Sequence, residues 1–583
     1  MMQAMVCSRI CLLSMVVFAW LCAHAVASPQ HVGLQLLSAS LPEALRGRIE
    51  TIGRSPSMTV QNETLGTLAS LVGFYERRGF RPVWLYDEGL RPHADALVQV
   101  ISQAEREGIQ PTGYHLLRIE QLMAEFRQRD SQDLPQRLHA WVDLELLLTD
   151  AFFMYGSHVL TGQIDPRDLQ EVWFVDRPEV DLETVLQQAS EADLIAQLRR
   201  DLRPPHAGYA ALQKALVAYR DISARGGWPV IPEGAKLQSG DGGPRVAVLR
   251  HRLRLTSDVD EASTPVDDLF DVALERGVQR FQERHGLDAD GVVGPATLMA
   301  LNVPVQVRVR QIELNMERWR WLPQTLGDRY VLVNIANFAL DVVEHGQSVL
   351  AMRAVVGRPA RQTPFFSADM TYLVLSPHWY VPPTIAIQDK LPLIRRNPAY
   401  VARQNFKLFR HGAGGMARVD PMSVDWSSVG VRNFPYQLRQ EPGPQNALGR
   451  VKFMLPNRYD VYLHDTPSRE LFAKIERAFS SGCIRLEKPL ELAQYLLRDD
   501  PRWSQQKILA SIKRGTEQVV QLPTSIPVHL LYWTAWVNED GVVHFRKDIY
   551  ERDKVLDEAL QKSFSSRKDK EDKEKMEVAL KDQ

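Results

Sequence analysis

One cysteine and one histidine in the C-terminal half of the chain have the types and the spacing of a nucleophile and its base. Cys483 lies in the run Ser-Ser-Gly-Cys-Ile-Arg at 480–485, and His464 lies nineteen positions upstream. The other three of the four cysteines fall within the first 22 residues. A lone cysteine is often only a small buried hydrophobic residue. Paired with a histidine that can remove its proton, it predicts acyl transfer through a thiol.

A helix is predicted between these two candidate residues. Thr466 is a suitable N-cap, and Pro467 suits the first helical turn. The inward positions would be three apolar residues, Phe472, Ile475 and Phe479. Gly482 then lets the backbone bend, so that amides near the nucleophile can point at a substrate carbonyl oxygen.

Other chemistries have weaker support in the sequence. The remaining fourteen histidines lack the paired spacing of zinc ligands, and neither a Walker sequence nor HExxH occurs, so we expect no metal and no cofactor. Residues 565–568 match Ser-x-x-Lys, but they lie in a charged tail, where chance explains the match. A papain-like peptidase is disfavoured because its cysteine precedes its histidine along the chain.

The first 27 residues have the pattern of an export signal. Arg9 supplies a positive start, an apolar run covers 10–21, and a small-x-small cleavage site ends at Ala27. We predict cleavage there; the alternative is an uncleaved membrane anchor, because the apolar run continues weakly to Ala27. A lipoprotein site at Cys22 is disfavoured, since Trp20 stands where small residues are expected. The mature protein is expected outside the inner membrane, in a periplasm if the cell has one.

Length and charge bound the remaining possibilities. The formal net charge of −1 becomes −2 without the signal, which gives no case for nucleic acid as a partner. The mature chain of about 556 residues, with ordinary apolar and charged fractions, is long enough for three or four domains. With a single thiol left after cleavage, it can form no intramolecular disulfide.

The N-terminal half predicts a helical scaffold followed by a small three-helix unit. Apolar residues recur at helical spacing through most of 28–235, and glycine-rich linkers follow. Within 240–305, one helix carries Val246, Leu249 and Leu253, and a second passes through Val278 and Phe281. Pro295 suits the first turn of a short third helix. The runs His285-Gly286-Leu287 and 290–297, Asp-Gly-Val-Val-Gly-Pro-Ala-Thr, resemble the peptidoglycan-binding domain of many cell-wall enzymes.

From Tyr330 the apolar period changes to two, which predicts a mostly antiparallel sheet across 327–500. Residues 384–445 interrupt the strand pattern and are too long for a plain loop, so a capping insertion over the site is expected. Residues 501–560 predict a C-terminal segment with a hairpin turn at Asp540-Gly541, packed on the scaffold. The tail, 563–583, is rich in both charges and is predicted to be disordered. The fold class is therefore multidomain α+β.

The motif around Cys483 resembles that of the L,D-transpeptidases, which have a YkuD-type catalytic domain. Their pattern is His-Gly-Thr/Ser followed by Ser-His-Gly-Cys-x-Arg. Asp465 stands here for the usual glycine and Ser481 for the second histidine, so His464 is the only candidate base. The runs 462–467, 480–483 and 442–450 instead look like the large YcbB-type branch, which is similar in layout as well.

The resemblance implies a substrate and roles. Cys483 would attack the carbonyl of the third residue of a peptidoglycan tetrapeptide stem, expel D-alanine and form a thioester. His464 would act as general acid and base, and the side-chain amine of another stem would complete a 3→3 cross-link. The expected oxyanion and substrate residues are Gly482, Ser481, Arg485 and Tyr462. Other cell-wall synthesis enzymes are possible partners, and carbapenems are expected to acylate the cysteine.

Two other functions remain open at this point. An L,D-carboxypeptidase would use the same cysteine and resolve the thioester with water, and no residue separates it from a transpeptidase. A non-catalytic wall-binding scaffold would keep Cys483 only as a relic, although the intact His464 counts against that function.

Overall fold

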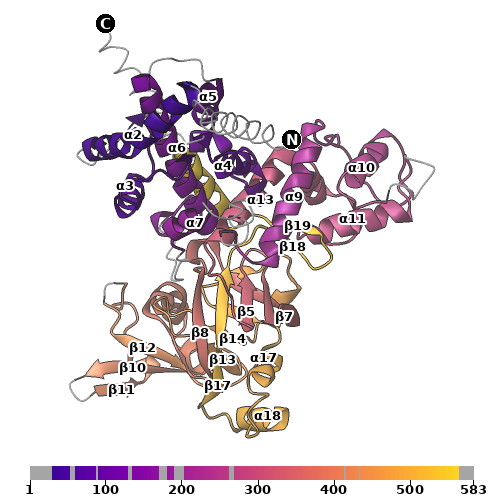
Figure 1. Ribbon diagram of the computed structural model, residues 1–583. Coiled ribbons are helices and arrows are strands. Elements are labelled where there is room, and N and C mark those ends of the chain that lie inside the picture. The colour runs from indigo at the N-terminus through magenta and orange to yellow at the C-terminus, as the bar shows by residue number, and fades with distance from the viewer. Residues whose placement is uncertain are drawn as a thin grey trace, which may run out of the picture.

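The computed structural model describes residues 29–52, 59–86, 89–128, 134–169, 180–189, 198, 202–260, 268–412, 415–431 and 433–563. The predicted signal peptide and all but the first residue of the predicted tail lie outside this set. Within it, no helix combines the length and the apolar character needed to cross a bilayer. Figure 1 shows a helical region at the top, a smaller helical unit beside it, and a β region below. The predicted multidomain α+β class is thus confirmed.

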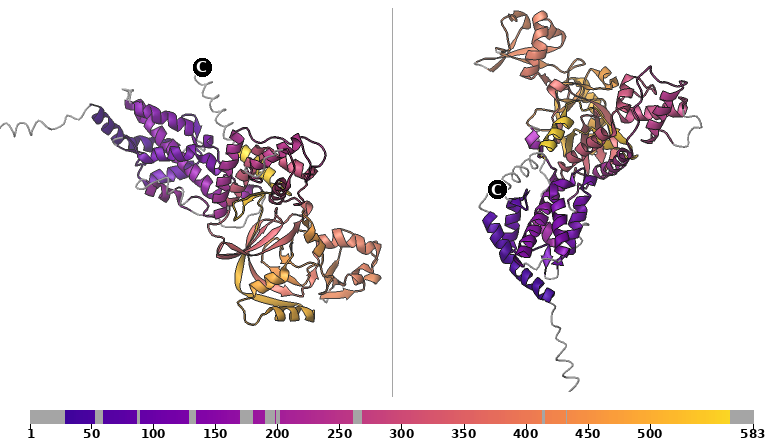
Figure 2. Two further views of the ribbon diagram at one scale, coloured as in Figure 1. Left: turned by 90° about the vertical axis from the view of Figure 1, so that its right-hand side faces the viewer. Right: turned by 90° about the horizontal axis from the view of Figure 1, so that it is seen from above.

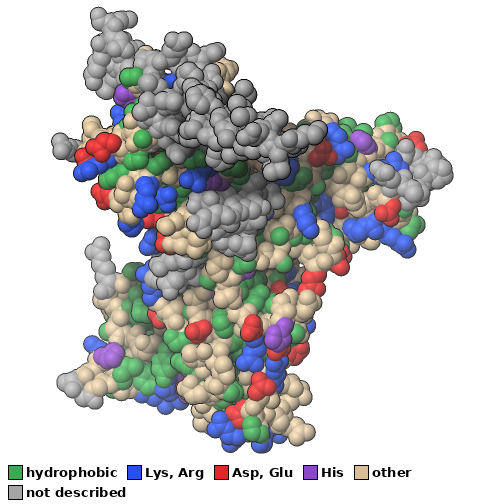
Figure 3. Space-filling view, in the orientation of Figure 1, with side chains coloured by type: hydrophobic (Ala, Val, Ile, Leu, Met, Phe, Trp, Pro, Cys, Tyr) green, Lys and Arg blue, Asp and Glu red, His purple; other side chains and the backbone are tan. Residues whose placement is uncertain are grey.

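The helical region is built around one long helix, α6 (Leu134–Thr161), whose middle is buried on all sides. The region also contains two short antiparallel strand pairs, β1 (Thr59–Val60) with β2 (Glu63–Thr64) and β3 (Leu85–Tyr86) with β4 (Gly89–Leu90). The surrounding helices are α2 (Pro29–Ile52), α3 (Leu68–Arg77), α4 (Pro92–Ser102), α5 (Leu116–Gln128), α7 (Leu182–Ala189) and α9 (Ala207–Ala224). Positive and negative side chains are mixed over the face that Figure 3 shows, in keeping with the near-zero net charge.

The small unit has the three helices that the sequence predicted. They are α10 (Pro244–Arg254), α11 (Val272–Arg284) and α12 (Pro295–Leu301). Asp271 caps α11 by accepting a hydrogen bond from the Leu274 amide at 2.8 Å. The helices close over a core of their own, which includes Val246, Leu249, Leu253, Val278 and Phe281.

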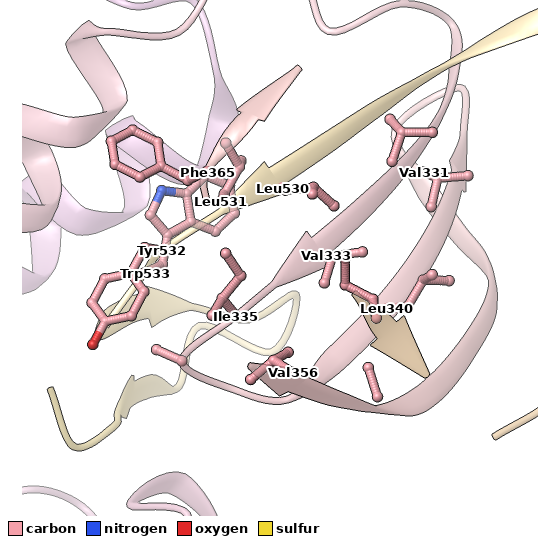
Figure 4. Packing of buried hydrophobic residues seen from close by; sticks show 14 of the residues in the cluster. Val331, Val333, Ile335, Leu340, Val356, Phe365, Leu530, Leu531, Tyr532 and Trp533 are labelled. Atoms are coloured by element: carbon pink, nitrogen blue, oxygen red, sulfur yellow. The ribbon is translucent and has the colours of Figure 1, made fainter. Parts of the chain in front are cut away.

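A long helix, α13 (Val305–Arg320), leads from this unit into a closed sheet. The strand order is β15-β7-β16-β14-β13-β8-β17-β5-β6, and β6 also pairs with β7, so eight strands form a ring with β15 attached outside it. The strands are β5 (Arg329–Asn334), β6 (Ala339–Glu344), β7 (Gln347–Gly357), β8 (Phe366–Leu375), β13 (Val451–Met454), β14 (Leu463–His464), β15 (Ala478–Ser480), β16 (Ile484–Leu486) and β17 (Gln518–Leu531). Figure 4 shows inward residues of β5, β6, β7 and β17 packed together.

The end of the β region differs from the prediction. We expected it to stop at residue 500, and the segment 501–560 to contribute only a hairpin. Instead β17 lies inside the ring, antiparallel to β8 and parallel to β5, with Val528 opposite Val331. Only β18 (Ala535–Val537) and β19 (Val543–Phe545) form the hairpin, which packs against α9 and α11. The apolar run through 528–537 hid the break between the two strands. Helices α17 (Pro489–Leu496) and α18 (Gln505–Arg514) precede β17.

A cap stands out from the β region, with its own sheet and its own core (Figure 2). The cap's sheet has the order β11-β10-β12-β9. These strands are β9 (Trp379–Tyr380), β10 (Phe406–Gly412), β11 (Gly415–Val419) and β12 (Tyr436–Gln440). Short helices, α14 (Pro383–Ile385), the π-helix η5 (Ala386–Lys390), α15 (Leu391–Arg396) and α16 (Tyr400–Arg403), complete it.

The helix predicted between His464 and Cys483 is absent from the structure. Its place is taken by one short 3-10 turn, η7 (Arg469–Ala473), and by β15. Thr466 accepts from the amide of Ser468 at 3.2 Å, which makes a local turn. Ile475 and Phe479 are about half exposed. Their apolar spacing therefore does not mark the buried face of a helix. Pairing of β15 with β7 outweighs local helix propensity here.

Candidate active site

Five of the six predicted site residues meet in one cleft between the cap and the β ring. The cleft has a volume of about 920 Å³. The five are Cys483, His464, Tyr462, Ser481 and Arg485, and Gly482 lies behind them, outside the lining. The opposite wall is formed by the cap segment 379–390. Among the described residues, no group of three or more His, Cys, Asp or Glu side chains converges as a metal site would.

Parallel pairing of β14 with β16 places the histidine beside the cysteine. Leu463 pairs with Ile484 and His464 with Arg485, so the ends of the two strands lie next to each other. Cys483 directly precedes β16, at the exit of the nucleophile turn, which we define as residues 480–483. The sheet thus closes the nineteen-residue gap that separates the two residues in sequence.

The His464 ring is held as a neutral base. Its Nδ1–H donates to the carbonyl oxygen of Asp465 at 2.5 Å, and a carbonyl can only accept. This contact fixes the tautomer and leaves Nε2 unprotonated. Burial, reinforced by the nearby Arg485 charge, lowers the pKa of His464 to about 3. The imidazole is therefore uncharged at neutral pH, with Nε2 as its acceptor atom.

Asp465, where the resembling family has glycine, has a structural role. Its carboxylate is buried and accepts from the Arg450 amide at 2.9 Å and the Arg450 Nε at 3.0 Å. Gly449 is needed at this contact, because a Cβ there would lie 2.5 Å from Asp465. Asp465, which replaces the family's glycine, thus contacts Gly449 and Arg450 of the run 442–450. The two sequence features form one structural unit next to His464.

Cys483 is a protonated thiol in this structure. Burial raises its pKa, while hydrogen bonds from Tyr462 and the positive charges of Lys452 and Arg485 act in the opposite direction. Its Sγ donates a long hydrogen bond, 3.9 Å, to the carbonyl oxygen of Asp460. In the described part of the chain, no hydrogen bond joins the thiol to the imidazole. Proton transfer between them therefore awaits the substrate, as catalytic contacts often tighten only in the complex.

The nucleophile turn is fixed by its own hydroxyl. Ser480 Oγ accepts from the Gly482 amide at 3.1 Å and donates to the Cys483 carbonyl at 2.6 Å. Gly482 adopts φ +117°, a conformation that favours glycine. Its amide is thus already used and cannot serve as the expected oxyanion donor. The Cys483 amide has no acceptor among the described residues, which makes it the available donor.

A loop that the sequence did not indicate supports this turn from behind. We call residues 357–363 the bracing loop. Thr363, fully buried, donates through Oγ1 to the Gly482 carbonyl at 2.8 Å and accepts from the Gly357 amide at 2.8 Å. Tyr550 donates to the Gly357 carbonyl at 2.5 Å and accepts from the Thr363 amide at 3.3 Å. A residue almost 70 positions after the nucleophile thus helps to hold it.

The bracing loop also ties the cap to the nucleophile turn. Arg361 donates to Ser481 Oγ at 2.9 Å and binds both carboxylate oxygens of Asp389, in the cap, at 2.7 and 3.0 Å. Ser481, expected to contact substrate, therefore has its hydroxyl occupied by Arg361. No sequence motif marked Arg361, because its partners lie 28 and 120 positions away.

Two cations line the cleft and form no salt bridge with any described residue. The Arg485 guanidinium makes no hydrogen bond among the described residues, and its Nε is buried. Lys452 lies 3.9 Å from the centre of the Tyr462 ring, on the strand next to His464. Lys452 was missed from the sequence, where it looks like any polar residue on an alternating strand. An unpaired, desolvated cation is costly, so this pair is suited to bind an anionic group.

The pH dependence of Cys483 alkylation tests whether the Cys483 thiol and the His464 imidazole are both uncharged. We expect the rate of iodoacetamide labelling to rise continuously with pH and to reach half its maximum above the ordinary thiol value of about 8.5, because burial raises the thiol pKa. Labelling is followed at the Cys483 peptide by mass spectrometry. A constant high rate between pH 5 and 8 would show a thiolate-imidazolium pair and contradict this assignment.

Three sequence-family models match parts of the chain. The model described as the L,D-transpeptidase catalytic domain, YkuD, matches residues 328–519. A scaffold-domain model matches 69–216, and a model described provisionally as peptidoglycan binding matches 242–301.

Known proteins give the same picture. A curated protein of Haemophilus influenzae, provisionally named an L,D-transpeptidase, is 34% identical over 250 residues, which are 42% of this chain and 49% of that protein. This chain thus spans about half the length of its curated relative. The L,D-transpeptidase (residues 123–326) from Xylanimonas cellulosilytica is 17% identical, with 52% of this chain and 99% of that chain covered and a TM-score of 0.17. The LD transpeptidase LdtMt1 in complex with imipenem is 13% identical, with 35% and 59% covered and a TM-score of 0.17.

Both TM-scores are low, so the assignment rests on the sequence matches. The match at 328–519 includes both the histidine and the cysteine of the cleft. The chain thus contains regions similar to a YkuD-type L,D-transpeptidase catalytic domain, to a peptidoglycan-binding domain and to a scaffold domain.

Proposed function

We propose that this protein is a peptidoglycan L,D-transpeptidase that forms 3→3 cross-links between stem peptides through a thioester on Cys483. The observation that carries the proposal is the cleft itself. It places a thiol and a neutral histidine with a fixed tautomer in one site, inside a region that matches the L,D-transpeptidase catalytic domain.

The first half-reaction uses the residues as they stand. Cys483 Sγ attacks the carbonyl carbon of the third stem residue while His464 Nε2 takes the thiol proton. The oxyanion that develops accepts a hydrogen bond from the Cys483 amide. The bond to D-alanine then breaks, and the imidazolium returns the proton to the leaving amine. The products are a thioester and free D-alanine.

The second half-reaction transfers the acyl group to an amine. The side-chain amine of a third residue in another stem attacks the thioester, and His464 carries the proton from nitrogen to sulfur as the C–S bond breaks. Water in place of the amine would give a tripeptide, the carboxypeptidase outcome. Arg485 and Lys452 would bind a carboxylate of the stem, since both line the cleft and neither forms a salt bridge among the described residues.

The proposed setting is the cell wall outside the inner membrane. The match at 242–301 to a peptidoglycan-binding family supports wall association, and the export pattern in the first 27 residues supports a periplasmic site of action. The three-helix unit would hold the enzyme at the polymer while the cleft acts on its stem peptides. Other wall-synthesis enzymes are proposed partners on functional grounds alone.

Muropeptides test the activity directly. With disaccharide-tetrapeptide, we expect a dimer whose mass equals that of two monomers minus one free D-alanine, identified by mass spectrometry. Cys483→Ala removes the nucleophile and should abolish the product, and His464→Ala should lower its rate at least about 10³-fold.

The outcomes separate the candidate functions. Tripeptide without dimer would replace transpeptidation by carboxypeptidase action. No turnover and no acyl-enzyme from a folded wild-type protein would contradict both and favour a wall-binding scaffold.

A carbapenem tests the thiol as an acyl acceptor without any peptidoglycan. We expect imipenem to add one molecule's mass to the wild-type protein, at the Cys483 peptide, because the strained lactam carbonyl offers the thiol a target with no separate leaving group. Cys483→Ala is the matched control and should stay unmodified in intact-mass spectra. Equal labelling of the two proteins would place the reaction elsewhere and argue against Cys483.

A further inference from the structure

One carboxylate of the cleft stands apart from the other acids around it. Asp460 lines the cleft, is exposed, and makes no ion pair among the described residues. Its main-chain oxygen is the acceptor for the Cys483 thiol at 3.9 Å. Its φ of +54° is unusual for a residue with a side chain, although aspartate tolerates it better than most. The turn at Asp460 therefore contacts the nucleophile through its main chain, and its carboxylate belongs to a residue that lines the same cleft.

The neighbouring acids are all occupied by cations. Asp389 is bound by Arg361, and Asp465 by Arg450 at 3.0 Å. Glu441 receives Lys407 at 2.6 Å and Arg439 at 2.8 Å. Asp460 is the exception among these acids within the described part of the chain. Lys452 is close enough for its charge to interact with that of Asp460, but the two residues form no ion pair, so the carboxylate can still bind a ligand.

A carboxylate in a substrate cleft attracts a positively charged group of a ligand. The cations Lys452 and Arg485 line the same cleft and can take an anionic group. The cleft therefore offers a negative and a positive subsite around one thiol.

We propose that Asp460 binds the ammonium group of the acceptor substrate and holds it beside the thioester. This inference rests on the proposed transpeptidase function and names the subsite for its second substrate. The reacting group of the acceptor is an amine that carries a positive charge before it reacts, and its nitrogen must come within bonding distance of the carbon attached to Cys483 Sγ. A carboxylate on the residue that already touches Sγ through its carbonyl is suitably placed for that docking.

Docking precedes the chemistry. The bound ammonium first loses one proton to solvent. The amine then attacks the thioester carbonyl, the C–N bond forms, and the C–S bond breaks. The second nitrogen proton passes through His464 Nε2 to the Cys483 sulfur, which restores the resting thiol. Asp460 takes no part in the proton transfers and acts as a binding group.

Asp460→Asn tests the subsite, because asparagine tolerates the same backbone conformation and removes only the charge. Donor tetrapeptide alone should acylate this variant at the wild-type rate or faster. With increasing acceptor, the concentration that gives half-maximal cross-linking should rise about tenfold or more, and the tripeptide fraction should increase. Glu517→Gln is the matched control, since Glu517 already contacts His378 at 3.3 Å. The ratio of cross-linked dimer to tripeptide that it forms should equal that of the wild type.

A neutral nucleophile separates charge recognition from a general structural effect. Hydroxylamine is uncharged at pH 7.5, so its reaction with the thioester should be equal in wild type and Asp460→Asn. Unchanged acceptor dependence in the variant would overturn the inference and leave the transpeptidase function intact. Slower acylation, or an equal loss with hydroxylamine, would also overturn it, in favour of a positioning role. A wild-type protein that forms no acyl-enzyme would refute the function and the inference together.

Discussion

The hydrogen bond from Thr363 to the carbonyl of Gly482 is the contact on which the geometry of the site most depends. It lies in a fully buried position, where a polar group without a partner costs about 1–3 kcal/mol. The same hydroxyl accepts from the Gly357 amide, so one side chain joins the bracing loop to the nucleophile turn. Loss of the hydroxyl would leave the Gly482 carbonyl and the Gly357 amide unsatisfied together, and the turn that carries the thiol would be free to move.

The bracing loop connects three parts of the chain that are far apart in sequence. Tyr550 reaches it from the segment after the C-terminal hairpin, and Arg361 extends from it to Asp389 in the cap. A bidentate arginine-carboxylate pair fixes orientation as well as distance. The bracing loop therefore holds both the cap wall and the nucleophile turn. This shared support explains how an inserted subdomain can form one wall of the substrate cleft without displacing the thiol.

The sequence predicted what local pattern determines. The motif around Cys483 and His464 identified both reactive residues, and the period-two pattern located β5, β6 and β7. It failed where pairing over long distances decides the structure. The segment after Thr466 has helical spacing, yet β15 is held by β7, more than 120 positions upstream. Thr363, Tyr550 and Lys452 have no distinctive neighbours in sequence, and only the folded ring brings them to the site.

The most direct test of this account is the acylation rate of Thr363→Val, which keeps the shape of the side chain and removes its hydroxyl. Single-turnover acylation by donor tetrapeptide should fall about tenfold to a hundredfold, corresponding to about 1.4–2.7 kcal/mol. Thr363→Ser, which restores the hydroxyl, should return most of the rate. A folded Thr363→Val protein that acylates as fast as the wild type would contradict the claim that this hydrogen bond positions the nucleophile.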